Sequence, residues 1–349
     1  CRPLSSERSQ GRMRSLVLLL TASSFLSEAS RPKDASQLRE ADGSQLRLLM
    51  CVTGQLGRLE YSSKIENFVK NNAVKGHVVD VVMIIDDKDE TQFVNKKYDE
   101  AAAAGNDTKV MIQQATGAFE KYANKVRYVS HQQPAEPEPA YWYINSLDKT
   151  DKSRFDIEAV ERFRTHVRQF ETMEQCYEQM MELEYESGKQ YDEILRVRED
   201  GYVIEPITLL HEMKREKPAD FLVNECDSWQ GYNDKAALIR RPVADTYFRG
   251  LLRAIYLGGE YLLPKAELRV KNPETLLKSV LSKAQFTALE SRNYLPISPL
   301  RTAASSGFST DCLDMKVPNC WGDYIFKAGK QGLARCKDLI PSEKLKTEN

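Results

Sequence analysis

The chain has 349 residues, of which 41% are hydrophobic, so it can bury a sizeable core. Its 50 lysines and arginines nearly balance its 51 acids, which gives a formal net charge of −1 at pH 7. This balance produces no broad positive field and argues against a nucleic acid as partner. We therefore expect a folded globular protein.

The first 30 residues have the pattern of a targeting segment for the secretory pathway. Met13 and Arg14 precede an apolar run of about 12 residues, and small residues follow it. A helix that spans a bilayer needs about 20 residues. We therefore expect a signal peptide or a short signal anchor at residues 1–30, with Met13 as the start. Contact with a membrane is expected only through this segment if it stays uncleaved, and an amphipathic piece without a targeting role is the alternative.

The residues that follow fit the same compartment. Residues 31–45 are polar and contain serine, which predicts a flexible stem. Seven cysteines are present and six of them follow Met13, an even number that permits disulfides in an oxidising lumen while leaving their pairing open. Asn106 begins a glycosylation sequon. We expect a location in the ER or Golgi lumen, or secretion.

The folded part is expected at residues 46–300. An apolar run at residues 46–52 leads through Thr53 into a turn with two glycines, and helical spacing follows at residues 59–69. A second apolar run at residues 77–85 leads directly into the acids Asp86, Asp87 and Asp89. Strand, helix and strand in succession predict an α/β fold with a doubly wound, mostly parallel sheet and flanking helices.

Helices and strands continue to alternate along the chain. We expect, in order, a strand at 125–130, a proline-rich loop at 132–139, one or two charged helices at 155–186, a helix at 207–214, strands at 221–224 and 236–239, and helices at 243–256 and from Asn272. The stripe of 155–186 that is expected to face the core comprises Phe155, Val160, Phe163, Val167, Phe170, Met173, Tyr177 and Met181. Residues 301–349 are expected to form a loop-rich extension that contains cysteines.

The segment YDEILRVRED at residues 191–200 has the most informative pattern. If it is a strand, Arg196, Arg198 and Asp200 share the face opposite its apolar residues. Ligands of an open α/β sheet bind beyond the carboxyl ends of its strands, where Glu199 and Asp200 would lie. These two carboxylates could hold a divalent metal. The alternative is a solvated row of salt bridges on an edge strand.

Two other segments are expected at the same edge of the sheet. The turn after the first strand offers backbone N–H groups and a cation to a phosphate, from Gly54, Gln55, Gly57 and Arg58. A plain connection between strand and helix is the alternative. The segment SWQGYND places an aromatic pair beside polar groups that can hold a sugar, namely Trp229, Tyr232, Asn233 and Asp234. Here the alternative is that both aromatic residues belong to the core. The acids after the second strand are a weaker metal candidate than Asp200, because such a run is typical of a solvated helix start.

These segments together resemble a family. The succession CVTGQLGRLE, a hydrophobic strand, YDEILRVRED, CDSWQGYNDKAALI and NPETLL resembles glycosyltransferase-like proteins of algae and other protists. It is also similar to bacterial lipopolysaccharide and capsule glycosyltransferases, over about residues 46–300. The resemblance implies a GT-A type nucleotide-sugar fold and often Mn²⁺ or Mg²⁺. By this resemblance Glu199 and Asp200 match the metal-binding acids, residues 54–58 match the turn that contacts the nucleotide, and Asp234 matches an acid near the acceptor. The chain departs from the family's Asp-x-Asp pattern, because it has Arg198, Glu199 and Asp200 there.

The chemistry of sugar transfer fits these residue types. Cleavage of a sugar–phosphate bond builds negative charge on the diphosphate, so we expect a divalent ion or Arg196 and Arg198 to stabilise it. Asp234 is expected to take the proton of the acceptor hydroxyl. The expected function is transfer of a sugar from a nucleotide-sugar donor to a glycan, glycoprotein or glycolipid. The alternatives are a secreted carbohydrate-binding domain with the same fold and no catalysis, and a sulfotransferase-type enzyme, which would need a more basic turn.

Overall fold

The computed structural model describes residues 45–86, 108–131, 136–147, 159–213, 218–226 and 228–299, and the backbone of three strands between residues 301 and 329. The predicted signal segment, the predicted stem up to residue 44, the acids Asp87 and Asp89, the sequon residue Asn106 and the stripe residue Phe155 lie outside the described residues. Within the ranges above, no helix has the length and apolar character needed to cross a membrane.

A seven-stranded sheet forms the centre of the fold, in the order β3-β2-β1-β4-β7-β6-β8. Its strands are β1 (Arg47–Gln55), β2 (Val78–Asp86), β3 (Lys125–Ser130), β4 (Glu193–Arg198), β6 (Phe221–Val223), β7 (Ala236–Arg240) and β8 (Ala288–Glu290). Strand β7 runs antiparallel to both of its neighbours, and the other pairs are parallel. The predicted α/β fold with a mostly parallel sheet is confirmed, with one reversed strand. Because β4 lies between β1 and β7, the edge-strand alternative is wrong.

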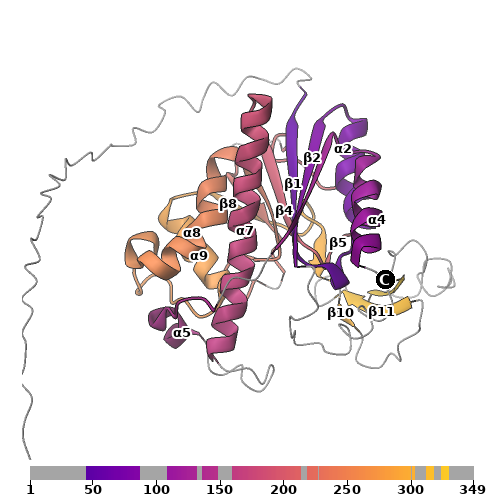
Figure 1. Cartoon of the computed structure of the whole chain (residues 1–349). Coiled ribbons are helices and arrows are strands. Elements are labelled where there is room, and N and C mark those ends of the chain that lie inside the picture. Colours follow the sequence, from indigo (N-terminus) through magenta and orange to yellow (C-terminus); the bar gives the residue numbers. More distant parts are fainter. Residues whose placement is uncertain are drawn as a thin grey trace, which may run out of the picture. The chain divides into compact units, whose positions relative to one another are not determined.

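Helices cover both faces of this sheet (Figure 1). One face packs against α5 (Tyr141–Ser146), α7 (Ala159–Ser187), α8 (Ala244–Leu257) and α9 (Pro273–Lys283). The other face packs against α4 (Thr108–Glu120) and a helical segment made of α1 (Ser62–Lys64), the π-helical η3 (Ile65–Lys70) and α2 (Asn71–Val74). Side chains alternate along each strand, so Leu49 and Cys51 enter the first core, whereas Leu48 and Met50 enter the second.

The strand order reverses between β1 and β4. From β1 the chain moves outward to β2 and then β3, with the helices 62–74 and α4 on one face. It then returns through α5 and α7 on the opposite face to β4, on the other side of β1. In open α/β sheets a ligand crevice forms outside the carboxyl ends of the strands at such a reversal. This place in the fold is therefore where a site is expected.

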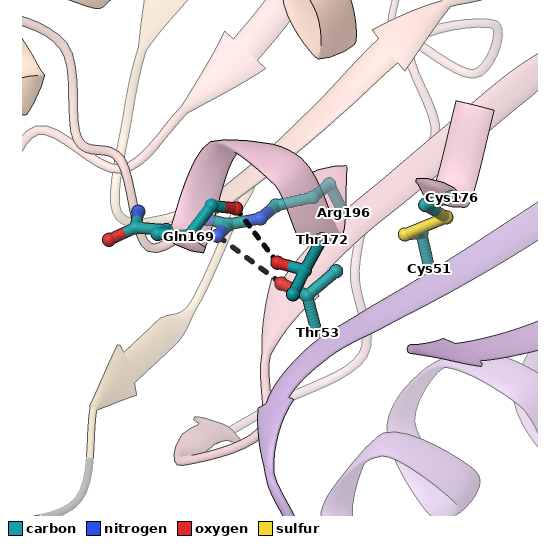
Figure 2. Close-up of a disulfide and its surroundings, with 6 residues drawn as sticks. All are labelled: Cys51, Thr53, Gln169, Thr172, Cys176 and Arg196. Atoms are coloured by element: carbon teal, nitrogen blue, oxygen red, sulfur yellow. Dashed lines mark hydrogen bonds between the residues drawn. A yellow bond between two sulfur atoms is a disulfide. The ribbon is translucent and has the colours of Figure 1, made fainter. Parts of the chain in front are cut away.

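A disulfide joins the central strand β1 to α7 (Figure 2). Cys51 and Cys176 are fully buried, and their Cα atoms are 6.3 Å apart although 125 positions separate them in the sequence. Cys226 is disulfide-bonded as well. The predicted use of disulfides is confirmed, and it is compatible with a secreted protein.

The helix predicted at 207–214 is wrong for the residues that the structure describes there, 207–213, which contain turns and no helix. The backbone N–H groups of Leu210 and His211 donate to the carboxylate of Glu193, at 2.9 and 2.6 Å. The N–H of Ile207 donates to the carbonyl oxygen of Asn67. These long-range partners accept hydrogen bonds from the backbone N–H groups of the segment. Its apolar residues can therefore be buried without forming a helix.

The predicted core-facing stripe of α7 needs correction. Val160 and Met181 are each 40% exposed, although they were predicted to face the core. An α-helix has 3.6 residues per turn, so positions spaced by steps of four gradually leave the buried face. The buried stripe therefore continues through Cys176, Met180 and Leu183.

Short strands lie outside the central sheet. Within residues 301–349, β10 (Arg301–Thr302), β11 (Cys312–Val317) and β12 (Tyr324–Gly329) form a three-stranded antiparallel sheet. Strands β5 (Gly201–Val203) and β9 (Ile297–Pro299) pair separately.

Candidate functional site

The ends of β1 and β4 bring the predicted glycine turn and the predicted acids together. Thr53 pairs with Arg198 in the parallel register of these strands, and the N–H of Glu199 donates to the carbonyl oxygen of Thr53 at 2.9 Å. Gly54 has a φ of +140°, and a Cβ atom there would overlap the carboxylate of Glu199. The glycine therefore serves a close approach between the two segments.

Four side chains form an arginine–carboxylate cluster at this point: Arg58, Arg198, Glu199 and Asp200. Arg58, from the 3₁₀ turn η2 (Leu56–Arg58), pairs with Glu199, and its Nη1 lies 3.8 Å from Asp200 Oδ2. Arg198 Nη2 lies 3.1 Å from the same oxygen, and its Nε lies 3.9 Å from Glu199 Oε2. Burial lowers the pKa of Arg198, but the acids around it, Asp200 first, raise that pKa by more than burial lowers it. The net shift of the pKa is therefore upward. The guanidinium group is therefore charged at every working pH.

A second group, the Asp234–Lys235–Glu274 group, lies where β7, α7 and α9 meet. Lys235 Nζ is 3.0 Å from Asp234 Oδ1 and 3.2 Å from Glu274 Oε1. Gln169 of α7 donates from its side-chain amide to Asp234 Oδ2 at 2.9 Å. Glu274 lies in the first turn of α9, which begins as predicted after a capping box at Asn272. Both oxygens of Asp234 thus have partners.

The two carboxyls of this group have opposite pKa shifts. Burial raises the pKa of Asp234, but Lys235 and Arg198 lower it more, so Asp234 stays ionised. Burial and the neighbouring Asp234 raise the pKa of Glu274 to about 8. A carboxyl that titrates near neutral pH is suited to proton transfer, whereas one with a depressed pKa is a weak base. Chemically, Glu274 is the better proton acceptor of the two.

Arg196 lies inside the protein. Its side chain is fully buried, and its guanidinium group donates to the carbonyl oxygen of Asp234 and to Thr53 Oγ1, the latter at 3.4 Å (Figure 2). These contacts tie β1 to the loop before β7. The structure thus places this predicted nucleotide-binding residue beneath the site as a support.

The predicted aromatic segment divides into buried and exposed parts. Tyr232 is buried and packs edge-on against Phe221, with ring centroids 5.3 Å apart. Asn233 is buried too, and its side chain donates to the carbonyl oxygen of Cys226 and accepts from the N–H of Lys235. Of the two aromatic residues, Trp229, with 52% of its surface exposed, is the one that a ligand could reach.

Four residues of this region were not predicted from the sequence, namely Gln169, Lys235, Glu274 and Lys64. Lys64 is fully buried, and its ammonium group donates to the carbonyl oxygens of Glu60, Glu199 and Gly201. It therefore fixes the turn that contains Glu199 and Asp200, and burial lowers its pKa. Three signals were available in the sequence: Lys64 stands four residues after Glu60, Lys235 follows Asp234 directly, and Glu274 stands two residues after a helix cap.

A small hollow adjoins the η2 turn. Its volume is about 20 Å³, which is room for about one water molecule, and it is lined by Leu56, Leu59, Tyr61, Met111 and Gln114. Leu56 and Leu59 flank Arg58 in the chain. The lining of the hollow is mixed, and Leu56 belongs to the same turn as Arg58. Gln55 ends β1 and Gly57 lies in the η2 turn, so both belong to the same connection as Arg58.

The residues present do not fit a divalent metal ion in this arrangement. Glu199 and Asp200 are both engaged by guanidinium groups, which a dication would have to displace. Across the described ranges, no group of three or more His, Cys, Asp or Glu side chains is placed to hold a metal. The Mn²⁺ or Mg²⁺ expected from the resemblance stays a prediction.

Comparison with known proteins does not assign this chain to a family. No protein-family model and no curated protein matches this chain. The resemblance to glycosyltransferases therefore stays a prediction as well, and the geometry of the two side-chain groups is what bears on function.

Proposed function

We propose that this protein binds a nucleotide sugar and transfers the sugar to a glycan, glycoprotein or glycolipid, using a GT-A type fold. One observation carries the proposal: the arginine–carboxylate cluster lies at the carboxyl ends of β1 and β4, where the strand order reverses. This is where α/β sheets bind nucleotides. The resemblance of the sequence to glycosyltransferases supports the same assignment.

The proposed donor lies across the end of β1. Its diphosphate contacts Arg58 and Arg198, and its nucleobase packs on the open surface beside Tyr61, next to the η2 turn. Guanidinium groups present paired N–H donors to phosphate oxygens and stabilise the charge that develops as the diphosphate leaves. Trp229, which is exposed, offers an aromatic face to a sugar ring.

In the proposed transfer one bond breaks, one bond forms and one proton is transferred. The bond between the anomeric carbon and the diphosphate oxygen breaks, and its electron pair stays on the diphosphate. The acceptor oxygen forms a bond to the anomeric carbon, and its proton passes to the Asp234–Lys235–Glu274 group. Within that group Glu274, with a pKa of about 8, accepts the proton in its ionised form.

We place the protein in the secretory pathway. The buried disulfide between Cys51 and Cys176 supports this, because such bonds persist in oxidising compartments. The apolar run after Met13 supports the same location.

A second candidate function is carbohydrate binding without transfer. One observation favours it: both carboxylate oxygens of Asp234 are engaged, by Gln169 and Lys235. An acid held in this way is a poor base. The two candidates differ in whether Glu274 carries out proton transfer.

A two-step experiment tests the proposal. A thermal-shift screen with UDP, GDP, CDP and ADP identifies the nucleotide, since a ligand that binds only the folded state raises the melting temperature. Hydrolysis and transfer are then measured with the matching nucleotide sugars for wild type, Glu274→Gln and Asp234→Asn, with the exposed Glu260→Gln as the matched control.

Three outcomes separate the candidates. Turnover that Glu274→Gln lowers by about a hundredfold, with Glu260→Gln unchanged, supports the transferase. Stabilisation by a nucleotide or glycan without turnover supports the binding domain. If no nucleoside diphosphate raises the melting temperature, the proposed donor site is wrong.

A further inference from the structure

The arginine side chains of the arginine–carboxylate cluster are more exposed than its carboxylates. The side chains of Arg58 and Arg198 are 13% and 16% exposed, whereas those of Glu199 and Asp200 are 1% and 3% exposed. A charged ligand that approaches from solvent therefore meets positive charge before negative charge. This arrangement of charge favours the binding of an anion over the binding of a dication.

The buried carboxylates hold the two arginines together. Arg58 comes from the turn after β1 and Arg198 from the end of β4, and two guanidinium groups this close would repel each other without an acid between them. Asp200 Oδ2 lies 3.8 Å from one and 3.1 Å from the other. Glu199 pairs with Arg58 from its position against Gly54. The acids thus act as supports of a cationic surface.

We infer that Arg58 and Arg198, and not a divalent metal ion, neutralise the diphosphate of the donor. The inference rests on the proposed function, because it concerns the same ligand. A guanidinium group matches a pair of phosphate oxygens with a planar fork of N–H donors and keeps its charge. In the structure, Arg198 donates an N–H group to Asp200. A bound diphosphate accepts from the same N–H group, so Asp200 and the diphosphate compete for it.

Isothermal titration with UDP and GDP tests the inference on the full protein, once in EDTA and once in MnCl₂. We expect the affinity in EDTA to lie within about threefold of the affinity in MnCl₂, and Arg58→Gln and Arg198→Gln each to weaken it by about tenfold or more. Arg253→Gln is the matched control, because Arg253 pairs with Asp245 on α8 and is not part of either group.

The variant Asp200→Asn gives effects of opposite sign under the two alternatives. If the arginines bind the diphosphate, removal of the competing charge leaves binding in EDTA unchanged or strengthens it by a fewfold. If a metal binds it, the loss of a ligand weakens binding in MnCl₂ by tenfold or more. Arg58→Lys, which keeps the charge but loses the fork, serves where Arg58→Gln does not fold, and it is expected to bind more weakly than wild type.

The result that overturns the inference differs from the result that overturns the proposed function. Binding that disappears in EDTA, returns with MnCl₂ and survives Arg58→Gln contradicts the arginine role while supporting a nucleotide site. Absence of UDP and GDP binding under both conditions contradicts the proposed function, and the inference with it.

Discussion

The carboxylate of Glu199 lies directly against the Cα atom of Gly54, at a place where any side chain on residue 54 would overlap it. The two residues belong to neighbouring strand ends, and the glycine has a φ of +140° that side-chain-bearing residues rarely adopt. The position of the acid that supports Arg58 thus depends on the absence of a single methyl group.

We expect Gly54→Ala to reduce both stability and nucleotide binding. The substitution adds a backbone cost of about 1–3 kcal/mol and also displaces Glu199. Gly76→Ala is the matched control, because Gly76 also has a positive φ, of +88°, but has open space where its Cβ would lie. Urea unfolding and calorimetric titration measure the two effects. Equal loss of binding in both variants would contradict the role given to Gly54.

We expect Lys64→Met to destabilise the fold by about 3 kcal/mol or more, because it leaves buried carbonyl and carboxylate groups without their cation. Lys64 is fully buried and pairs with Glu60 at 3.5 Å. Lys70→Met is the matched control, since Lys70 makes the same pair with the residue four positions earlier but is 36% exposed. Thermal unfolding of both variants measures the difference, and we expect no measurable change for Lys70→Met.

We expect the double variant Cys51→Val/Cys176→Ala to lose about 2–5 kcal/mol of unfolding free energy, because the disulfide closes a long loop in the unfolded chain. The substitutions keep the site apolar and limit the cavity left behind. Urea unfolding under non-reducing conditions measures the loss and leaves the bond at Cys226 intact. An unchanged midpoint would show that α7 holds to β1 by packing alone.

We expect the stability of the protein to fall between about pH 5 and pH 8, partly through Glu193. Burial raises the pKa of Glu193 to about 7 from an ordinary value of 4.5. Because the folded state holds the proton more tightly than the unfolded state, the contribution is complete below pH 4.5 and is lost as the pH rises through 7. At roughly 1.4 kcal/mol for each unit of pKa, the loss amounts to about 3 kcal/mol.

Urea unfolding at several pH values tests this dependence. Glu193→Gln is expected to flatten the decline, whereas the exposed control Glu267→Gln is expected to follow the wild type. Parallel profiles for wild type and Glu193→Gln would show that Glu193 does not contribute to the decline.

Much of the fold could be predicted because its signals are local. The apolar runs that end at Thr53 and Ile85 form β1 and β2, and residues 125–130 form β3 as predicted. Asn272 and Pro273 fixed the start of α9 through a cap whose partners are three residues apart. The segment 207–213 was not predictable in this way, because the carboxylate that binds its backbone belongs to Glu193 on another strand.

The candidate site shows the same division. The sequence pointed to the strand ends that carry Arg58, Arg198, Glu199 and Asp200, but it did not indicate which of these groups would face the solvent. Arg58 and Glu199 are 141 positions apart, and their pairing depends on β1 and β4 being neighbours. Arg196 was predicted at the ligand, yet burial under the loop before β7 makes it a support.

The sequence by itself determined the α/β class, the positions of most strands and helices and the segments that carry charge to the sheet edge. These follow from periodicity and capping, which act over a few residues. The tertiary structure decided the reversal of β7, the pairing of Cys51 with Cys176 and the partners of each acid. These depend on contacts between distant segments, since the charge that a carboxylate meets is set by what folds next to it.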